Sequence, residues 1–362
     1  MDLINDFRDK RYVLSLSSTI NKTLTSKINI MEICGGHTHS IMKFALPKLL
    51  DERINFIHGP GCPVCVMPQS RVDQAIKLSA RDDVILATLA DMLRVPGSSS
   101  TLSKQRAMGA DVRALYTPMD LLKIAKENPT KNVVFFAIGF ETTAPMTCVV
   151  IQKALELGIG NLFFHINHVT VPNTIEAILK DDKDVHIDGF IAPSHVSVIT
   201  GSKIYEEIAT RYKRPFAVSG FEPVDILDGI LNLVKQHQNG TFEVYNEYKR
   251  VVLPEGNVKA KELIERYFRP CDFEWRGLGV IPNSAYELKD EFDFINAKVK
   301  FDCSVEKHKE NSACICPEIL RGRAKPNECK LFSKVCNPQH PIGSCMVSSE
   351  GACAAYYKYK KI

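Results

Sequence analysis

The 362-residue chain lacks several features that would place it in a familiar class of proteins. No segment approaches the roughly 18 uninterrupted apolar residues of a membrane-spanning helix, so we expect no membrane partner. No run of five or more like charges appears and the formal net charge is only +4, which argues against a nucleic-acid partner. The N-terminal ten residues carry early acids and no apolar core, unlike a signal peptide. We therefore expect a cytoplasmic protein.

The composition is that of an ordinary globular protein, with 45% apolar and 24% charged residues. The length exceeds the size at which one hydrophobic core keeps growing, so several domains are expected. From about residue 28 to residue 240, short apolar runs alternate with helical segments, which predicts parallel sheets covered by helices. The predicted strands are 28–33, 55–58, 84–90, 133–138, 162–166, 190–192 and 216–218.

This pattern predicts an α/β fold with two parallel-sheet domains, helices on both faces, and an irregular C-terminal region. Near Arg269 the periodicity fades while cysteine, proline and glycine become more frequent, so the irregular region begins close to that point. We assign 1–125 and 126–240 to the two α/β domains and 241–362 to the C-terminal region. One helix is expected from about Thr38, and another near Ser70, with Asp73 completing a capping pair.

The twelve cysteines are concentrated in two parts of the chain. In the cytoplasm thiols stay reduced, so such groups more often bind metal or carry out redox chemistry than form a disulfide framework. Three lie near the start, at Cys34, Cys62 and Cys65. Seven lie beyond residue 300: Cys303, Cys314, Cys316, Cys329, Cys336, Cys345 and Cys353.

The N-terminal cysteines each follow a predicted strand and precede a predicted helix. In α/β sheets this edge is where ligands bind, and a helix start lowers the pKa of a thiol. Cys34 is thus a candidate metal ligand, with His37 and, less directly, His39 as second ligands or proton carriers. Cys62 and Cys65 form a CxxC pair, which is either a redox dithiol or half of a zinc site that Cys34 and His37 complete.

The C-terminal cysteines suggest an iron–sulfur cluster, which is usually held by four thiolates. Their gaps are long and uneven, at 13 or 15, then 7, 9 and 8 residues, whereas zinc sites usually show paired knuckles. The spacing therefore favours a cluster over zinc, although four zinc-bound cysteines would have the same composition. Neither the C-x₂-C-x₂-C run of bacterial ferredoxins nor the CxxxCxxC of radical enzymes is present.

Further polar residues stand at predicted strand ends or in the tail. His165 lies within an apolar strand and is expected to be a core histidine, and Trp275 and Phe268 are expected in the core or an interface. The tyrosines at 356–359 either dock a partner or pack against the body. Residues that could line a cleft between the domains are Glu141, Thr142, Thr143, Asn167, His168, Ser194, His195 and Glu222.

Four motifs together resemble a known family. They are CGGHTH at 34–39, GPGCPVC at 59–65, GFETT at 139–143 and CMVSSEGACAAYY at 345–357. These motifs are similar to those of the HypD family of hydrogenase maturation factors, and the resemblance spans about residues 10–360.

The resemblance implies a scaffold that, with a small HypC-type partner, assembles the Fe(CN)₂CO group of [NiFe]-hydrogenases, while a HypE-type protein donates cyanide. It implies that Cys34 holds the iron, that His37 is the family's matching histidine, and that Cys62 and Cys65 are its redox-capable pair. Such a protein is a maturation scaffold with redox activity rather than a conventional turnover enzyme.

The resemblance further implies one C-terminal [4Fe-4S] cluster. Its ligands are Cys314, Cys329, Cys336 and Cys353, with Cys316 as the alternative first ligand and Cys345 as a substitute. An electron relay requires the Cys62/Cys65 pair to lie between Cys34 and this cluster. Two other functions fit the cysteines, an independent iron–sulfur thiol–disulfide oxidoreductase and a zinc-stabilised interaction protein.

Overall fold

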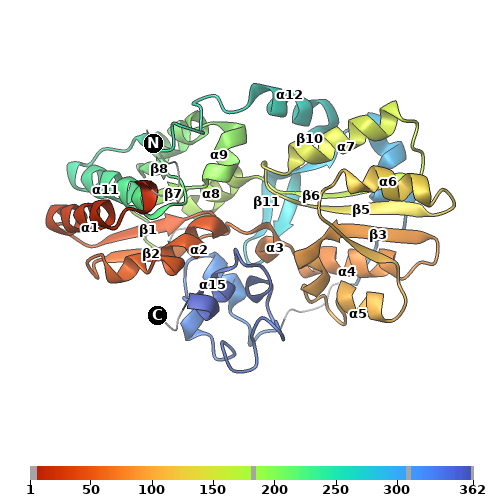
Figure 1. Ribbon diagram of the computed structural model, residues 1–362, viewed down its shortest axis with the longest axis horizontal. Coiled ribbons are helices and arrows are strands. Elements are labelled where there is room, and N and C mark those ends of the chain that lie inside the picture. The colour runs from red at the N-terminus through yellow and green to blue at the C-terminus, as the bar shows by residue number, and fades with distance from the viewer. Residues whose placement is uncertain (1–5, 181–184, 307–310, 360–362) are drawn as a thin grey trace.

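The structure is a computed structural model that describes residues 6–180, 185–306 and 311–359 (Figure 1). Two parallel sheets with helices on both faces stand side by side, and a cysteine-rich lobe formed by 311–359 lies against them. The predicted α/β fold with two parallel sheets is thus confirmed. In these three ranges no helix is both long and apolar enough to cross a membrane. We predict no role for His308, which lies outside the described residues.

The first sheet gathers strands from distant parts of the chain. Its order is β2-β1-β7-β8-β9, and all neighbours are parallel. Every residue of β7 and β8 is buried, because parallel strands in α/β proteins are covered on both faces. The strands are β1 (Ile28–Glu32), β2 (Ile54–His58), β7 (Gly189–Ala192), β8 (Phe216–Val218) and β9 (Val244–Asn246).

The second sheet is formed by the intervening chain. Its order is β4-β3-β5-β6, again with parallel neighbours. Strand β6 is buried along its whole length, including its histidines. The strands are β3 (Val84–Leu89), β4 (Val112–Leu115), β5 (Asn132–Gly139) and β6 (Leu162–His168).

Both sheets take strands from either side of residue 125. This is possible because a parallel neighbour is reached through a crossover, which brings together strands that are far apart in sequence. The division into domains at 1–125, 126–240 and 241–362 stays a prediction. The four strands of the second sheet lie in the sequence between β2 and β7 of the first sheet.

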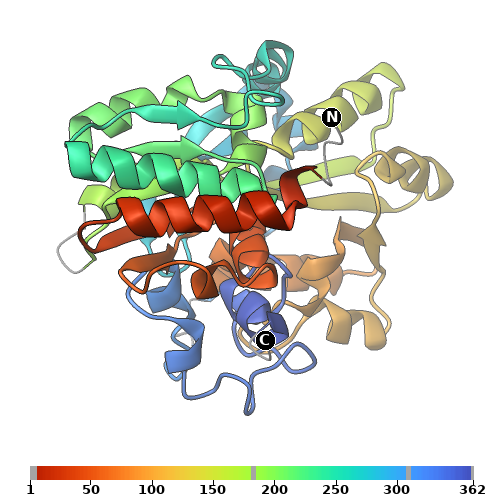
Figure 2. The same cartoon turned by 60° about the vertical axis from the view of Figure 1, so that its left-hand side comes forward.

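Helices cover both faces of each sheet. On the first sheet, α1 and α11 pack together across one face (Figure 2), where Ile20 and Ile230 contact apolar strand residues. The helices of the two sheets are α1 (Lys10–Thr23), α2 (Gly35–Lys43), α3 (Pro63–Val66), α4 (Gln69–Ser79), α5 (Leu102–Ala107), α6 (Asp120–Glu127), α7 (Ala144–Glu156), α8 (Val171–Lys180), α9 (Ser194–Thr200), α10 (Glu206–Tyr212), α11 (Pro223–Asn239), α12 (Val258–Tyr267) and α13 (Ala297–Lys300).

One helix start and one helix cap differ from the prediction, whereas α4 begins at Gln69, near Ser70 as predicted. Helix α2 begins at Gly35, directly after Cys34, rather than near Thr38. The expected capping pair of Ser70 and Asp73 is wrong, because the N-cap of α4 is Pro68 and the Asp73 carboxylate instead accepts the backbone N–H of Ser98 at 2.8 Å. Asp73 therefore holds a loop of the neighbouring α/β unit.

The chain beyond Arg269 is more regular than its sequence suggests. Strands β10 (Phe268–Trp275) and β11 (Gly279–Leu288) form an antiparallel hairpin that passes between the two sheets (Figure 1). The sequence does not reveal this hairpin, because buried and exposed residues do not alternate regularly along β10. Trp275 and Phe268 are both buried, which confirms their assignment to the core.

The C-terminal lobe packs on the first sheet through its last helix. It contains the helices α14 (Cys316–Leu320) and α15 (Ala352–Tyr359), and α15 contacts α2. Tyr356 shares a hydrogen bond with His58 Nε2 (2.9 Å), and Tyr359 shares one with His39 Nε2 (2.9 Å). Both tyrosines therefore pack against the body of the protein, one of the two predicted outcomes for the tail.

Replacing Tyr356 with Phe should lower the free energy of unfolding by about 1 kcal/mol, because the Nε2 atom of buried His58 loses its hydrogen-bond partner. Urea unfolding followed by circular dichroism measures the change. Tyr357→Phe is the matched control, since Tyr357 is 37% exposed. Equal stability of the two variants would contradict a stabilising role for the Tyr356 hydroxyl.

Candidate functional site

Cys34 lies between β1 and α2 and is the N-cap of α2. The backbone N–H groups of Gly36 and His37 lower the pKa of its thiol, as a helix start should. Burial of the thiol and, second, the nearby Glu350 carboxylate outweigh them and raise the pKa to about 12. The expectation of a lowered pKa is therefore wrong for the protein alone. A cation that bound the sulfur would displace the proton and reverse this balance.

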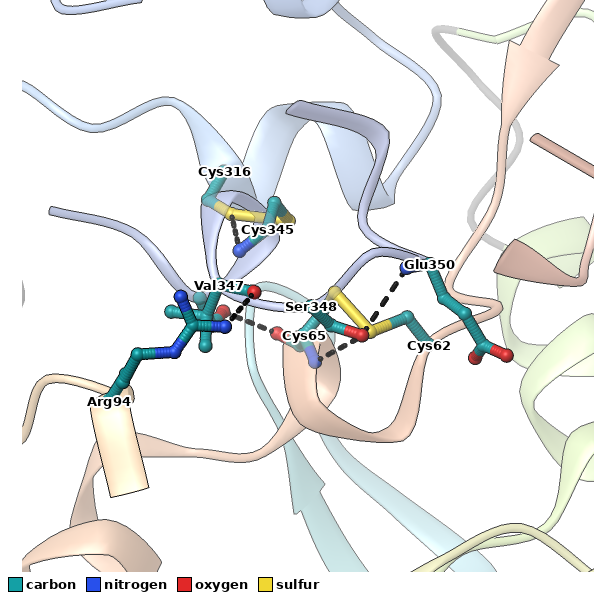
Figure 3. Close-up of a disulfide and its surroundings, with 9 residues drawn as sticks. Cys62, Cys65, Arg94, Cys316, Cys345, Val347, Ser348 and Glu350 are labelled. Atoms are coloured by element: carbon teal, nitrogen blue, oxygen red, sulfur yellow. Dashed lines mark hydrogen bonds between the residues drawn. A yellow bond between two sulfur atoms is a disulfide. The ribbon is translucent and has the colours of Figure 1, made fainter. Parts of the chain in front are cut away.

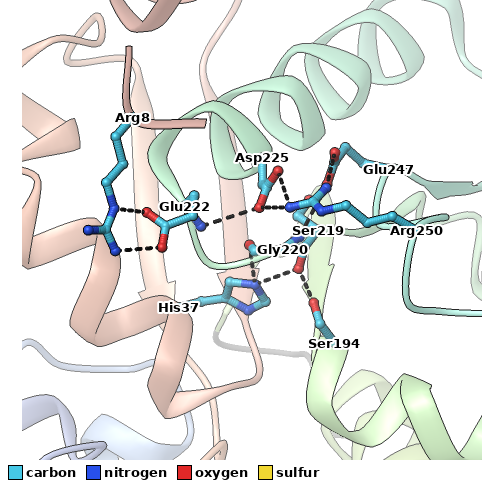
Figure 4. A network of polar contacts seen from close by, with 9 residues as sticks. All are labelled: Arg8, His37, Ser194, Ser219, Gly220, Glu222, Asp225, Glu247 and Arg250. Carbon is cyan, nitrogen blue, oxygen red and sulfur yellow. Dashed lines mark hydrogen bonds and ion pairs between the residues drawn. The ribbon is translucent and has the colours of Figure 1, made fainter. Parts of the chain in front are cut away.

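His37 is held in one tautomer by the first sheet. Its Nε2 atom is 2.9 Å from the Ser219 carbonyl oxygen and 3.2 Å from that of Gly220, so Nε2 must carry the proton (Figure 4). Burial lowers the pKa of His37 to about 4, so the ring is neutral near pH 7. Its buried Nδ1 has no hydrogen-bond partner among the described residues. Nδ1 is thus the nitrogen that is left to accept a proton or bind a ligand.

Ion pairs hold the loop that carries these carbonyl groups (Figure 4). Arg250 pairs with buried Asp225 at 2.6 Å, and Arg8 pairs with Glu222 at 2.5 Å. Phe221 of the same loop stacks on the His37 ring with centroids 4.7 Å apart. The ring position of His37 is therefore set by residues about 180 positions away in the sequence.

Cys62 and Cys65 follow β2 and are joined by a disulfide bond (Figure 3). Cys62 is the N-cap of the short helix α3, and both side chains are buried. Gly61 lies directly against the backbone of Cys34, so a Cβ atom at this position would collide with the Cys34 nitrogen and Cα. The Gly35 N–H also donates to the Gly61 carbonyl oxygen at 2.9 Å. The two cysteine loops are therefore packed backbone to backbone.

A cleft of about 500 Å³ opens beside Cys34. Its walls come from the ends of strands in both sheets and from the C-terminal lobe. Among the residues that line it are Cys34, Pro63, Phe140, Thr142, Thr143, His195 and Glu350.

The predicted cleft residues separate into two groups. Thr142, Thr143 and His195 line the cleft as expected. The other five were predicted wrongly, because their side chains are engaged elsewhere. Glu141 accepts the Val171 N–H, Asn167 contacts His165, His168 bonds Thr147, Ser194 donates to the Ser219 carbonyl oxygen, and Glu222 pairs with Arg8.

The C-terminal lobe brings four free thiols together, at Cys314, Cys329, Cys336 and Cys353. Burial first, and then the charges of the other three, raise the pKa of Cys353. The Ile342 N–H points at the Cys336 sulfur at 3.4 Å. Cys336 and Cys353 are buried, and Cys314 and Cys329 are half-buried. Four neighbouring thiols with an N–H donor fit the thiolate ligand set of a [4Fe-4S] cluster. Cys303 lies apart, beside Lys298 and Lys77.

Cys316 and Cys345 are joined by a second disulfide bond (Figure 3). The sequence treated them only as alternative cluster ligands and missed this pair. Pairing of this kind depends on the fold, because 29 residues separate the two cysteines. Within the described ranges, no three His, Cys, Asp or Glu side chains converge closely enough to hold a single metal ion.

The two groups of cysteines are in contact through the Cys62–Cys65 pair. On one side Gly61 touches Cys34. On the other side the Ser344 hydroxyl donates to the Cys65 carbonyl oxygen at 2.9 Å, and the adjoining Gly343 lies next to the Cys314 sulfur. The Cys62–Cys65 pair therefore contacts the Cys34 loop on one side and Ser344 of the lobe on the other, and its place between Cys34 and a cluster stays a prediction.

Comparison with known proteins agrees with this arrangement. The family model HypD, described as the hydrogenase formation hypA family, matches residues 11–360. The hydrogenase maturation factor HypD of Azotobacter vinelandii is 47% identical over 367 residues, which cover 99% of this chain and 97% of that protein. This chain belongs to the HypD family.

Other relatives match along nearly the whole chain as well. HypD of Escherichia coli (strain K12) is 43% identical over 371 residues, covering 100% of this chain and 99% of that protein. The hydrogenase expression/formation protein HupD of Azotobacter chroococcum mcd 1 is 48% identical over 367 residues, covering 99% and 97%. The HypD-family match therefore includes both the cleft and the lobe.

Glu350 lines the cleft, although the sequence of this HypD-family protein did not point to it. Its carboxyl lines the cleft and acts on the Cys34 thiol from 316 residues away in the chain. Burial raises its pKa. Glu350 lies between the two motif cysteines of the tail, Cys345 and Cys353, which is the only sequence signal that could have suggested it.

Replacing Gly35 with Ala should lower the free energy of unfolding by about 1–3 kcal/mol, because the new methyl group would overlap the Cβ and carbonyl oxygen of Glu350. Gly160→Ala is the control, since a Cβ there meets nothing within 4 Å. Urea midpoints measure both variants. If Gly35→Ala were as stable as its control, the close approach of the lobe to α2 would be refuted.

His168 should make stability depend on pH. Burial lowers its pKa from 6.5 to about 3, so the unfolded chain binds more protons between these values and stability falls as the pH drops below about 6.5. Between about pH 7 and about pH 5 this histidine should cost about 2 kcal/mol. His168→Gln should remove that part of the decline in urea unfolding, whereas replacing exposed His340 with Gln should not. An unchanged decline in His168→Gln would contradict a buried, neutral His168.

Proposed function

We propose that this HypD-family protein is the scaffold on which the Fe(CN)₂CO group of [NiFe]-hydrogenases is assembled. A small HypC-type protein would share the iron with Cys34, and a HypE-type protein would donate cyanide. The proposal places this assembly in the cytoplasm, where clustered thiols stay reduced. The observation that carries it is the continuous contact from Cys34 through Cys62 and Cys65 to four free thiols.

The role of Cys34 follows from its surroundings. Without a cation, burial keeps the thiol protonated, and the iron of the incoming group supplies the charge that stabilises a thiolate. Low-spin Fe(II) with cyanide and carbon monoxide prefers a soft donor such as this sulfur. Burial keeps His37 neutral near pH 7, so its unpaired Nδ1 brings no positive charge to the site.

The Cys62–Cys65 pair would supply electrons for cyanide transfer. If cyanide arrives as a thiocyanate on the donor protein, breaking its S–C bond takes two electrons and leaves a thiol on the donor. Oxidation of the two thiols to the disulfide releases two electrons and two protons, which balances the step. The pair lies one backbone contact from Cys34, so these electrons are released next to the iron ligand.

Cys314, Cys329, Cys336 and Cys353 would hold the resident [4Fe-4S] cluster. Bound there, the cluster supplies single electrons for the reduction of the disulfide. Its four ligands are the free thiols of the lobe, and Cys316, the alternative first ligand, is paired with Cys345. The Cys316–Cys345 pair stands between this ligand set and Cys65 and can pass electrons by the same thiol chemistry.

The two alternative functions have less support. An independent thiol–disulfide oxidoreductase needs an exposed attacking thiol, whereas Cys62 and Cys65 are only 3% and 1% exposed. A zinc site would require the four thiols to surround one ion, and no such convergence occurs in the described part of the chain. The ligands of a cluster sit farther apart, at separate corners of the cube.

Replacing Cys34 with Ala should abolish the infrared bands of iron-bound cyanide and carbon monoxide in the protein purified anaerobically with its HypC-type partner. The bands should vanish because the chain then offers no sulfur ligand in the cleft. Cys148→Ala is the control, since that buried thiol lies in α7 away from the cleft. Iron and labile sulfide should persist in both variants.

Two outcomes would overturn the proposal. Bands of full strength in Cys34→Ala would show that Cys34 is not the iron ligand. Zinc without iron in the wild-type protein would replace the scaffold with a zinc-stabilised interaction protein.

A further inference from the structure

A second groove lies between the start of α5 and the C-terminal lobe. It measures about 500 Å³, and its lining residues fall within 94–104 and 335–342. Residues of this groove do not line the cleft that holds Cys34. The proposed assembly chemistry therefore leaves it without a role.

The groove is positively charged. Arg94 and Lys104 line it, and the described lining residues include no Asp or Glu. Lys104 is exposed and pairs with no acid among the residues that the structure describes. Exposed Lys334 precedes Val335 of the lobe wall and adds to the positive rim.

Nearby acids are already engaged. Asp73 lies behind the loop and accepts the Ser98 N–H at 2.8 Å. Asp91 pairs with Arg94 at 3.6 Å. Because Arg94 is already paired with Asp91, the unpaired positive charge at the groove lies on Lys104 and Lys334.

The floor of the groove touches the proposed cluster ligands. Ile342 lines the groove, and its N–H points at the Cys336 sulfur at 3.4 Å. The next residue, Gly343, would place a Cβ 2.6 Å from the Cys314 sulfur. A protein seated in the groove is thus separated from two of the four free thiols by one stretch of backbone.

We propose that this groove is the docking site for a small acidic protein that carries one electron at a time. This inference rests on the proposed function, because it needs the cluster as the electron acceptor. A cluster held by Cys314, Cys329, Cys336 and Cys353 would accept one electron from the donor in each encounter. Two encounters supply the two electrons that, with two protons from water, convert one disulfide to two thiols.

Electrostatic attraction is the physical reason to expect such a donor. Opposite charge raises the association rate of transient complexes by roughly 10–10³-fold at low salt, and added salt screens it. Transient redox complexes bury little surface, so charge rather than apolar contact is expected to select the partner.

The test uses flavodoxin hydroquinone, an acidic donor whose semiquinone has a distinct colour. Stopped-flow mixing with the full-length, cluster-loaded protein follows semiquinone formation. The variant Lys104→Glu/Lys334→Glu reverses two charges at the groove. Lys10→Glu/Lys259→Glu makes the same change in net charge at exposed positions in α1 and α12. Reduced methyl viologen, a small cationic donor that needs no docking site, tests the intactness of the cluster.

With flavodoxin at low salt, the groove variant should react about tenfold more slowly than the wild type, while the control variant should react normally. Salt should slow the wild type, and methyl viologen should reduce all three proteins without this loss. A groove variant that accepts electrons from flavodoxin at the wild-type rate would overturn the docking site.

Failure of the proposed function would look different. Protein without iron or labile sulfide would refute the cluster, yet docking could still be measured as binding of oxidised flavodoxin by calorimetry. In that measurement Lys104→Glu/Lys334→Glu should weaken binding about tenfold relative to its control. Equal affinities would refute the groove whatever the metal content.

Discussion

The close backbone contact between Gly61 and Cys34 is the constraint on which the site depends. Strands β1 and β2 are parallel neighbours, so the loops that follow them leave the sheet at the same edge. A side chain at Gly61 would push these loops apart. With glycine there, Cys34 and the Cys62–Cys65 pair share one buried volume, and their chemistry can be coupled without a mobile segment.

Burial explains much of the electrostatics around this contact. It raises the pKa values of Cys34 and Glu350 and lowers those of His37 and His195, so each group favours its neutral form. The cleft therefore presents Cys34, His195 and Glu350 in forms that favour neutrality, with Asp91 as a further carboxyl group in its lining. If Cys34 binds iron as proposed, binding of the iron would be linked to loss of the Cys34 proton.

The C-terminal lobe has a structural role as well as a chemical one. Tyr356 and Tyr359 of α15 join the lobe to His58 and His39, and Glu350 closes the cleft above Cys34. The lobe has little regular structure, so its shape depends on these contacts and on its cysteines. If four of the thiols hold a cluster, the metal would stabilise the same lobe that brings Glu350 to Cys34.

Local patterns determined the parallel α/β fold, most strand positions and the three motif cysteines near the start, because apolar runs and glycine turns act over a few residues. Only the tertiary structure decided that the sheets interleave, that β10 and β11 form a hairpin, and that Cys316 pairs with Cys345. It also decided which polar residues reach the cleft, placing His195 there and turning Ser194 to the Ser219 carbonyl. Such contacts join residues far apart in the chain, and their energies depend on burial, which sequence spacing does not encode.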